Sequence, residues 1–266
     1  MVKMTAAIRH LFLVIQIKQP FVSLLYHRIG RVKDEVVKFM SQGTRKDAIL
    51  VTGGDREIGH YKKVKEAFSP APYVIGVDAG ALWLYEAGER IDLAVGDFDS
   101  IGEEGFRRLR EGGVSILPFP PEKDFTDTEL ALDQALRAGA KRLLIYAGLG
   151  TRFDHSLANV HLLYRCRMEG VEATIVDRWN RIHLINDGTD VKREYPFLSL
   201  IPFSEKVEGV TLTGFKYPLT NATLVWGKGI GISNELIADH GEIRLARGWL
   251  LVIESQDQEI DKPFSS

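Results

Sequence analysis

Short apolar runs alternate with helical patterns from Ala48 to about Ile185, and this alternation constrains the fold more than any other feature of the sequence. The runs are AILVT, YVIGV, DLAVG, VSILPF, RLLIYA and EATIV. Between them, helical patterns cover residues 80–87, 103–111, 128–138 and 155–168. Near-continuous apolar strands separated by helices are typical of βαβ units and of a parallel sheet covered on both faces. The sequence therefore predicts an α/β domain over residues 46–186.

The pattern changes after about Asn186, where no long helical pattern separates the apolar runs. These runs are FLSLIPF, GVTLTGF, ATLVW, EIRLA and WLLVIES, with Gly, Pro and Asn between them. Short strand-like runs of this kind predict a smaller all-β domain, a sandwich or a barrel of antiparallel strands, over residues 187–266.

Residues 1–45 form an N-terminal extension that differs from the rest in charge. The first 40 residues hold seven Lys or Arg against two acids, whereas the whole chain carries a formal net charge of −2. Three interpretations are open: translation that starts at Met40, a basic amphipathic segment that touches a membrane or partner, or a transit-like peptide. The apolar run LFLVIQI in this segment is too short to span a bilayer, which takes roughly 20 apolar residues.

The composition narrows the functional classes. A near-neutral charge balance argues against broad nucleic-acid binding, which needs a basic face. Cys166 is the single cysteine, so no intrachain disulfide can form. Because disulfide-free chains fit a reducing compartment, we expect a cytoplasmic protein that is not bound to a membrane.

Asp97 and Asp99 stand one residue apart in the stretch GDFDS, directly after the run IDLAV. In an extended chain such a pair points both carboxylates the same way, and two like charges so close repel unless a cation lies between them. Mg²⁺ is the natural partner, because it is usually held by one or two carboxylates plus substrate phosphates. The alternative is a surface Asx turn with Ser100 as a loop residue.

A second acidic cluster follows in KDFTDTELALDQAL. Thr126 and Glu129 have the S/T-x-x-E spacing of a capping box, which predicts a helix that starts at Asp127 and ends near Gly139. Asp127 then lies in the first turn, beside free N–H groups that also bind phosphate. Capping alone does not explain Lys123 in the same loop.

A third element is GLGTRFDHSLANVHLL. Gly148 and Gly150 allow close backbone approach after the preceding strand. Arg152 offers a planar donor fork that suits phosphate oxygens. Asp154 and His155 follow at a predicted helix start, and the alternative is an N-cap followed by an ordinary exposed histidine.

These three elements place acids, a lysine, an arginine and free helix N-termini at strand ends, where ligands of parallel sheets bind. A site for a metal–nucleotide phosphate needs cations that offset phosphate charge and carboxylates that hold the metal. The residues themselves therefore predict Mg²⁺-dependent phosphoryl or pyrophosphoryl transfer.

Four segments resemble, in order, the signatures of the thiamine pyrophosphokinase family: VDAGALWLYEAGERIDLAVGDFDSI, KDFTDTELAL, GTRFDHSLANVHLL and GFKYPLTNATLVWGKGIGISNELI. The resemblance implies transfer of the pyrophosphoryl group of ATP to the hydroxyl of thiamine, giving thiamine diphosphate and AMP. It also implies an α/β domain followed by a β-sandwich. Members of the family that resemble this chain are homodimers, with thiamine between the α/β domain of one subunit and the β domain of the other.

The resemblance further implies roles for individual residues. The Mg²⁺ ligands are Asp97, Asp99 and Asp127. The residues around ATP are Asp78, Lys123, Thr126, Arg152, Asp154 and His155. The residues by thiamine are Ser233, Asn234, Tyr217 and Trp226, although both aromatics could instead pack in the β core. Catalysis is assigned to Asp97, Asp99, Asp127, Arg152 and Asp154, and the proton acceptor is left open among Asp99, Asp154 and Asp78.

Two rival functions remain open from the sequence. One is a different metal-dependent enzyme that acts on nucleotides through a D-x-D pair. The other is a non-catalytic sensor of thiamine or a nucleotide that keeps the same scaffold.

Overall fold

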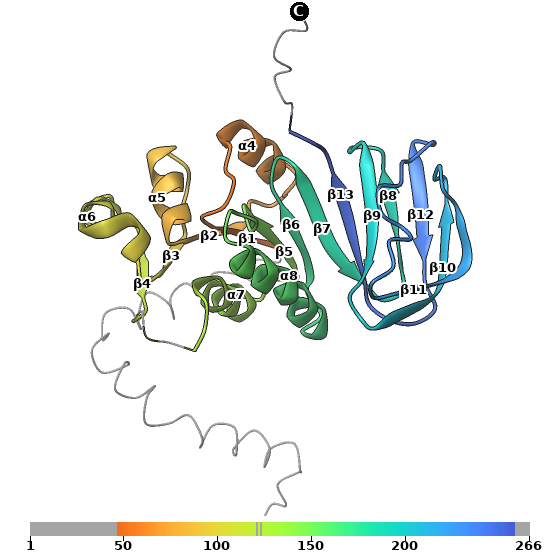
Figure 1. Ribbon diagram of the computed structural model, residues 1–266. Helices are drawn as coiled ribbons and strands as arrows, with labels where there is room; N and C mark the ends of the chain where they lie inside the picture. The colour runs from red at the N-terminus through yellow and green to blue at the C-terminus, as the bar shows by residue number, and fades with distance from the viewer. Residues whose placement is uncertain (1–46, 121, 123, 259–266) are drawn as a thin grey trace, which may run out of the picture. The chain divides into compact units, whose positions relative to one another are not determined.

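The computed structural model describes residues 47–120, 122 and 124–258, which fall within one compact unit (Figure 1). The predicted N-terminal extension lies outside the described residues. The helices are α4 (Ile58–Glu66), α5 (Ala79–Glu86), α6 (Gly102–Glu111), α7 (Asp127–Arg137) and α8 (Phe153–Met168). The strands are β1 (Asp47–Val51), β2 (Tyr73–Val77), β3 (Leu93–Gly96), β4 (Ile116–Pro118), β5 (Arg142–Tyr146), β6 (Glu172–Val176), β7 (Asn180–Ile185), β8 (Gly188–Lys192), β9 (Phe197–Pro202), β10 (Lys206–Thr213), β11 (Leu219–Val225), β12 (His240–Arg244) and β13 (Leu250–Ser255).

The larger sheet, sheet A, has the strand order β4-β3-β2-β1-β5-β6-β7-β13-β9. Its strands from β4 to β6 are parallel, as predicted, and β7, β13 and β9 continue the sheet in antiparallel fashion. Figure 1 shows α4, α5 and α6 on one face of the parallel part and α7 and α8 on the other. The strand order reverses between β1 and β5, and ligands of such sheets bind beyond the carboxyl ends of the strands near this reversal.

The parallel strands are apolar because helices cover both of their faces. All five residues of β2 are buried, and so are four of the five residues of β1. A strand covered on both faces has no solvent-facing positions that would favour alternating polar residues. Polar side chains therefore begin directly after these strands, at the carboxyl edge of sheet A.

The helices predicted from the sequence are confirmed to within two residues at each end, and one α-helix of the described residues was missed. That helix is α4, whose N-cap is Glu57 and whose only buried residue is Tyr61. A glutamate is not a favoured N-cap, and Gly59 in the first turn weakens the helical pattern. Among the described helices, none combines the length and the apolar character needed to cross a bilayer.

The smaller sheet, sheet B, has the order β11-β10-β12-β8 and is antiparallel. One core cluster joins it to the antiparallel part of sheet A, through Leu198 and Leu200 of β9 and through Val207, Val210 and Leu224 of sheet B. The predicted fold class is confirmed: an α/β unit with a parallel sheet is followed by antiparallel strands packed as a β-sandwich. One layer of that sandwich is continuous with the parallel sheet, because β7 pairs with β6.

Candidate active site

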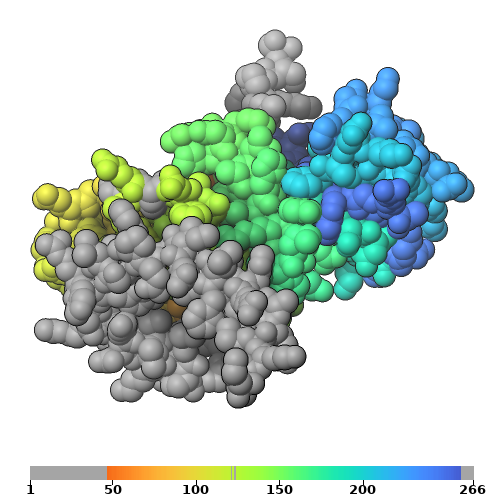
Figure 2. Space-filling model, turned by 90° about the horizontal axis from the view of Figure 1, so that it is seen from below, coloured from red at the N-terminus to blue at the C-terminus, as the bar shows by residue number. Residues whose placement is uncertain are grey.

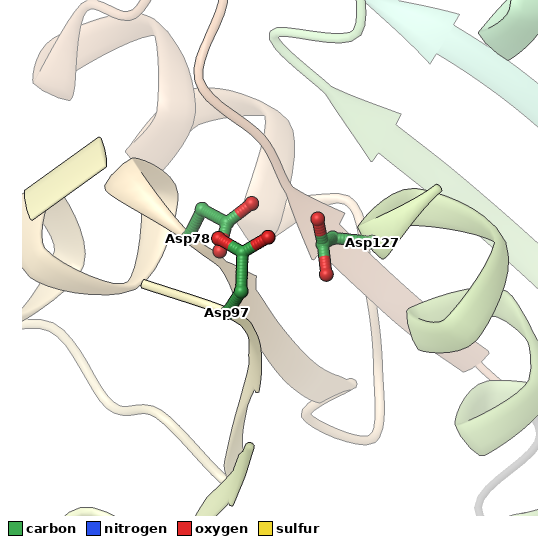
Figure 3. Close-up of side chains that lie close together, drawn as sticks. All are labelled: Asp78, Asp97 and Asp127. Atoms are coloured by element: carbon green, nitrogen blue, oxygen red, sulfur yellow. The ribbon is translucent and has the colours of Figure 1, made fainter. Parts of the chain in front are cut away.

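Three carboxylates from separate elements meet at the carboxyl edge of sheet A (Figure 3). Asp78 follows β2, Asp97 follows β3, and Asp127 is the first residue of α7. Each offers an oxygen that lies within 4.8 Å of the oxygens offered by the other two. Figure 3 shows the three side chains pointing toward one another, so they form one acidic cluster.

The pairing of β2 with β3 brings two of these acids together. Val77 is the partner of Val95 in this parallel pair, so Asp78 and Gly96 come next on adjacent strands. A Cβ on Gly96 would lie 1.8 Å from Asp78 Oδ1, and the φ of Gly96 is +152°. Glycine at this position therefore leaves the space that the Asp78 carboxylate occupies.

Phe98 fixes the backbone between Asp97 and Asp99, and no sequence motif indicated this role. Its φ is 62° and its side chain is 3% exposed. The ring packs against Phe106, with ring centroids 5.4 Å apart, while the Phe98 N–H donates to Asp78 Oδ1 at 3.1 Å. Burial of the ring helps to hold a left-handed conformation that is unfavourable for a residue with a side chain.

The extended geometry predicted for Asp97 and Asp99 is wrong. Asp99 begins a short 3₁₀ helix (Asp99–Ile101), and its N–H donates to Asp97 Oδ1 at 3.1 Å. The side chain of Asp99 is exposed, and the group of described acids close enough to share one ion contains Asp78 in its place. The Asx turn that the sequence left as an alternative describes this backbone, because the Asp97 side chain accepts the N–H of the residue two positions later.

The predicted start of α7 is confirmed, together with its capping box. The Glu129 N–H donates to Thr126 Oγ1 at 3.2 Å, and the Thr126 N–H donates to Glu129 Oε2 at 2.7 Å. Gly139 follows the last turn with a φ of +82°, as predicted for a C′ residue. The cap fixes the first turn of α7 and thereby the place of Asp127.

Burial and like charges act together on Asp78. Desolvation is the larger effect and raises the pKa of Asp78 to about 7, with further increases from Asp127 and Asp97. The hydrogen bond from the Phe98 N–H opposes this shift. Three carboxylates that crowd one another in this way favour a divalent cation among them, and an all-carboxylate donor set suits a hard ion such as Mg²⁺. The residues present therefore fit the predicted metal.

This shift predicts how the metal-free protein responds to pH. The pKa of Asp78 is raised from 3.8 to about 7 by folding, so its contribution to stability is present below pH 3.8 and is lost as the pH rises to about 7. The Asp78→Asn variant lacks this titration, and asparagine tolerates positive φ. We expect the wild type to lose unfolding free energy relative to the variant between pH 4 and pH 7, measured by urea denaturation. Parallel pH profiles would contradict the assignment.

Arg152, Asp154 and His155 lie at the start of α8, after β5, at the same edge of sheet A. Arg152 Nη2 donates to Asp154 Oδ2 at 2.6 Å, and both side chains are mostly exposed. This bond lowers the pKa of Asp154, and the His155 N–H lowers it further. The structure thus pairs Arg152 with Asp154 near the expected phosphate region, whereas Lys123 lies outside the described residues.

A pocket lies where the start of β11 meets the loop between β11 and β12, in the antiparallel region and not at the acidic cluster. It has a volume of about 130 Å³ and is lined by Tyr217, Leu219, Ile230, Gly231, Ile232 and Asn234. Of the predicted thiamine residues, Tyr217 and Asn234 line it, and Ser233 stands between two lining residues with its own side chain exposed. Core packing of the two aromatics is excluded, because Tyr217 is 57% and Trp226 is 61% exposed.

An acidic cluster at the carboxyl edge of a doubly wound sheet and a separate pocket beside the antiparallel strands give two candidate ligand sites, as an enzyme with two substrates requires. Two family models match the chain: the thiamin pyrophosphokinase catalytic domain over residues 64–175 and the thiamin pyrophosphokinase vitamin B1 binding domain over residues 182–250. The chain belongs to the thiamine pyrophosphokinase family, as its four motifs predicted, and it is an enzyme of that family.

Individual relatives agree with the family models. The chain is 40% identical to the thiamine pyrophosphokinase of Bacillus subtilis over 186 residues, which are 69% of this chain and 87% of that protein. The crystal structure of the Bacillus subtilis enzyme matches with a TM-score of 0.72 and 35% identity, covering 80% of this chain and all of that one. Yeast thiamin pyrophosphokinase matches with a TM-score of 0.67 at 16% identity, over 84% of this chain and 90% of that one, and supports the fold alone.

Proposed function

We propose that this protein transfers the pyrophosphoryl group of ATP to thiamine. The hydroxyl oxygen of thiamine loses its proton to a base and bonds to the β-phosphorus of ATP, the bond from that phosphorus to the oxygen shared with the α-phosphorus breaks, and AMP leaves with that oxygen. The observation that carries the proposal is the convergence of Asp78, Asp97 and Asp127 in a chain that matches both domains of the family. In-line transfers of this kind depend on positioning and charge neutralisation more than on covalent help from the protein.

Mg²⁺ is the proposed cofactor. Asp78, Asp97 and Asp127 would hold it, and Asp99, whose N–H donates to Asp97 Oδ1, remains a predicted further ligand. When bound, the ion supplies positive charge to the phosphate oxygens. Our proposal therefore assigns Asp78 to the metal ligands, whereas the family resemblance placed it among the residues around ATP.

The chain's own groups would place the triphosphate. The first turn of α7, fixed by Thr126 and Glu129, offers N–H groups that favour anions. Arg152 offers five donors, and its present partner Asp154 is an exposed carboxylate that phosphate oxygens can replace. His155 and Lys123 complete the predicted set around ATP.

Thiamine is proposed to bind at the pocket lined by Tyr217 and Asn234. The pocket is mostly apolar, and its volume of about 130 Å³ suits one ring rather than the whole vitamin. Thiamine is a permanent cation, so the exposed ring of Tyr217 can attract it through its aromatic face. Trp226 and Ser233 are exposed and remain predicted contacts for the remainder of the molecule.

The two sites are proposed to meet only between subunits of a homodimer. Asp78 follows β2, whereas Gly231 and Asn234 bond to β9, which is six strand positions away in sheet A. Neighbouring strands lie about 4.8 Å apart, so six positions correspond to about 29 Å between the acidic cluster and the pocket. This distance is more than thiamine and a pyrophosphoryl group can bridge. Figures 1 and 2 both place α7 and α8 (green) between the region of α5 and α6 (yellow) and the strands of sheet B (cyan to blue). A second copy would bring its pocket to the acidic cluster.

We also propose a cytoplasmic location. Cys166 is the only cysteine of the chain, and it lies buried in α8 as a free thiol. Cell fractionation that follows thiamine-dependent activity tests this placement, and activity confined to a secreted or membrane fraction would contradict it.

One assay tests the proposed reaction against its rivals. The protein is mixed with ATP, Mg²⁺ and thiamine, and the products are identified by mass. We expect thiamine diphosphate and AMP in equal amounts, with AMP formed only when thiamine is present. AMP formed without thiamine would favour a different nucleotide enzyme, and binding of both ligands without turnover would favour a sensor.

A further inference from the structure

Asn234 is the buried polar residue of the pocket, and its amide is engaged with the backbone of the protein. The side chain is 2% exposed. Its Oδ1 accepts the N–H of Tyr217 at 3.0 Å and the N–H of Glu235 at 2.9 Å, and its Nδ2 donates to the carbonyl oxygen of Tyr217 at 2.8 Å. The amide thus bonds to both backbone groups of Tyr217.

These bonds continue a short antiparallel ladder. Phe215 forms a bridge with Leu236, and the Lys216 N–H donates to the Glu235 carbonyl at 2.8 Å. At the next position of the ladder, a peptide group of the opposite segment would normally pair with Tyr217. Here the side-chain amide of Asn234 takes its place. A side-chain amide offers one donor and one acceptor in the planar arrangement of a peptide, which is why it can extend a ladder.

The main chain of Asn234 pairs in the other direction. It exchanges hydrogen bonds with Leu198 of β9, each of 2.8 Å. Asn234 therefore links the edge of sheet A to the segment that follows β10 of sheet B; its link to Leu198 joins two buried residues, and its link to Tyr217 is partly buried. A residue bound on two sides in this way has its conformation fixed by the fold.

Tyr217 is the residue that this arrangement presents to the pocket. Its ring is 57% exposed, lines the pocket, and has the ammonium of Lys216 5.6 Å from the ring centroid. Lys216 in turn forms an ion pair with Glu235, at 2.8 Å. The backbone of Tyr217 is held by Asn234, while its ring is left open to a ligand.

We propose that Asn234 is a positioning residue that sets the Tyr217 ring at the pocket for thiamine, and that it acts through Tyr217 rather than by touching the vitamin. This inference rests on the proposed function, because it takes the pocket to be the thiamine site. It assigns the motif asparagine a different role from that of a direct ligand. Aspartate in its place keeps the acceptors but loses the donor to the Tyr217 carbonyl, so two oxygens would face each other.

A double-mutant cycle tests the proposal. The dissociation constant for thiamine is measured by calorimetry on the full chain with Mg²⁺ for the wild type, Asn234→Asp, Tyr217→Ala and the double variant. We expect Asn234→Asp to weaken thiamine binding about tenfold in the wild-type background and to have no further effect when Tyr217 is alanine. The dissociation constant for ATP should stay unchanged in all four proteins. Asn186→Asp, the same change outside the pocket, serves as the control.

Each other outcome overturns the inference in a recognisable way. An equal loss of affinity in both backgrounds would mean that Asn234 touches thiamine directly. Unchanged affinity in Asn234→Asp would mean that the donor to Tyr217 has no role in binding. Unchanged affinity in Tyr217→Ala would remove the pocket assignment, while thiamine-dependent AMP formation would still report separately on the proposed reaction. Circular dichroism and melting temperature identify a variant that fails to fold, and in that case Asn234→Gln replaces Asn234→Asp in the cycle, with the same outcomes.

Discussion

Replacing Asp97 by asparagine is expected to lower turnover about a thousandfold while the protein remains folded. Asp97 provides one of the three oxygens within 4.8 Å of one another, and an amide oxygen carries no net charge for the ion. The rate of thiamine diphosphate formation measures the loss. Direct titration with Mn²⁺, followed by electron paramagnetic resonance, should show weaker ion binding independently of catalysis.

The same change should not destabilise the metal-free protein. Asp97 is one of the charges that raise the pKa of Asp78, so its removal relieves repulsion in the cluster. We expect an equal or higher melting temperature at pH 8 without metal. Asp190→Asn, at an exposed position of β8, is the matched control and should leave turnover unchanged. A near-normal rate in Asp97→Asn would show that the metal assignment is wrong.

Mixing two inactive variants is expected to restore about a quarter of the wild-type activity. One variant is Asp97→Asn, and the other is Ile232→Arg, which places a positive charge in the pocket proposed for a cationic vitamin. If each site combines the acidic cluster of one subunit with the pocket of the other, every mixed dimer has one intact site. Random reassociation gives mixed dimers in about half of the molecules, so about one site in four is active.

In the control mixture, both variants carry their change in the acidic cluster. Asp97→Asn mixed with Asp127→Asn should recover no activity, because every site then contains a changed acid. Recovery is measured on the unseparated mixture after co-expression with two different tags, and capture on both tags confirms that mixed dimers are present. Absence of recovery in the first mixture, with mixed dimers present, would mean that each chain brings its own pocket to its own acids.

The helices, strands and caps of the α/β region were largely predictable, because they depend on near neighbours in the chain. Thr126 and Glu129 stand three residues apart, and this spacing was enough to predict the start of α7 and the position of Asp127 within it. The pocket of the antiparallel region was not predictable in this way. Its lining comes from residues 217–219 and 230–234, and only the folded sheets bring these two segments together.

The sequence by itself determined the βαβ pattern, the acids that follow buried strands and the family to which the chain belongs, since each of these is written in local spacing and residue type. Only the tertiary structure decided which acids meet. The register of β2 against β3 places Asp78 beside Gly96, whereas Asp99, which follows the left-handed residue Phe98, begins a 3₁₀ helix and is not among the three acids that meet. Strand register and backbone handedness depend on contacts between distant segments, and a shift of one residue in the register would move a different side chain into the cluster.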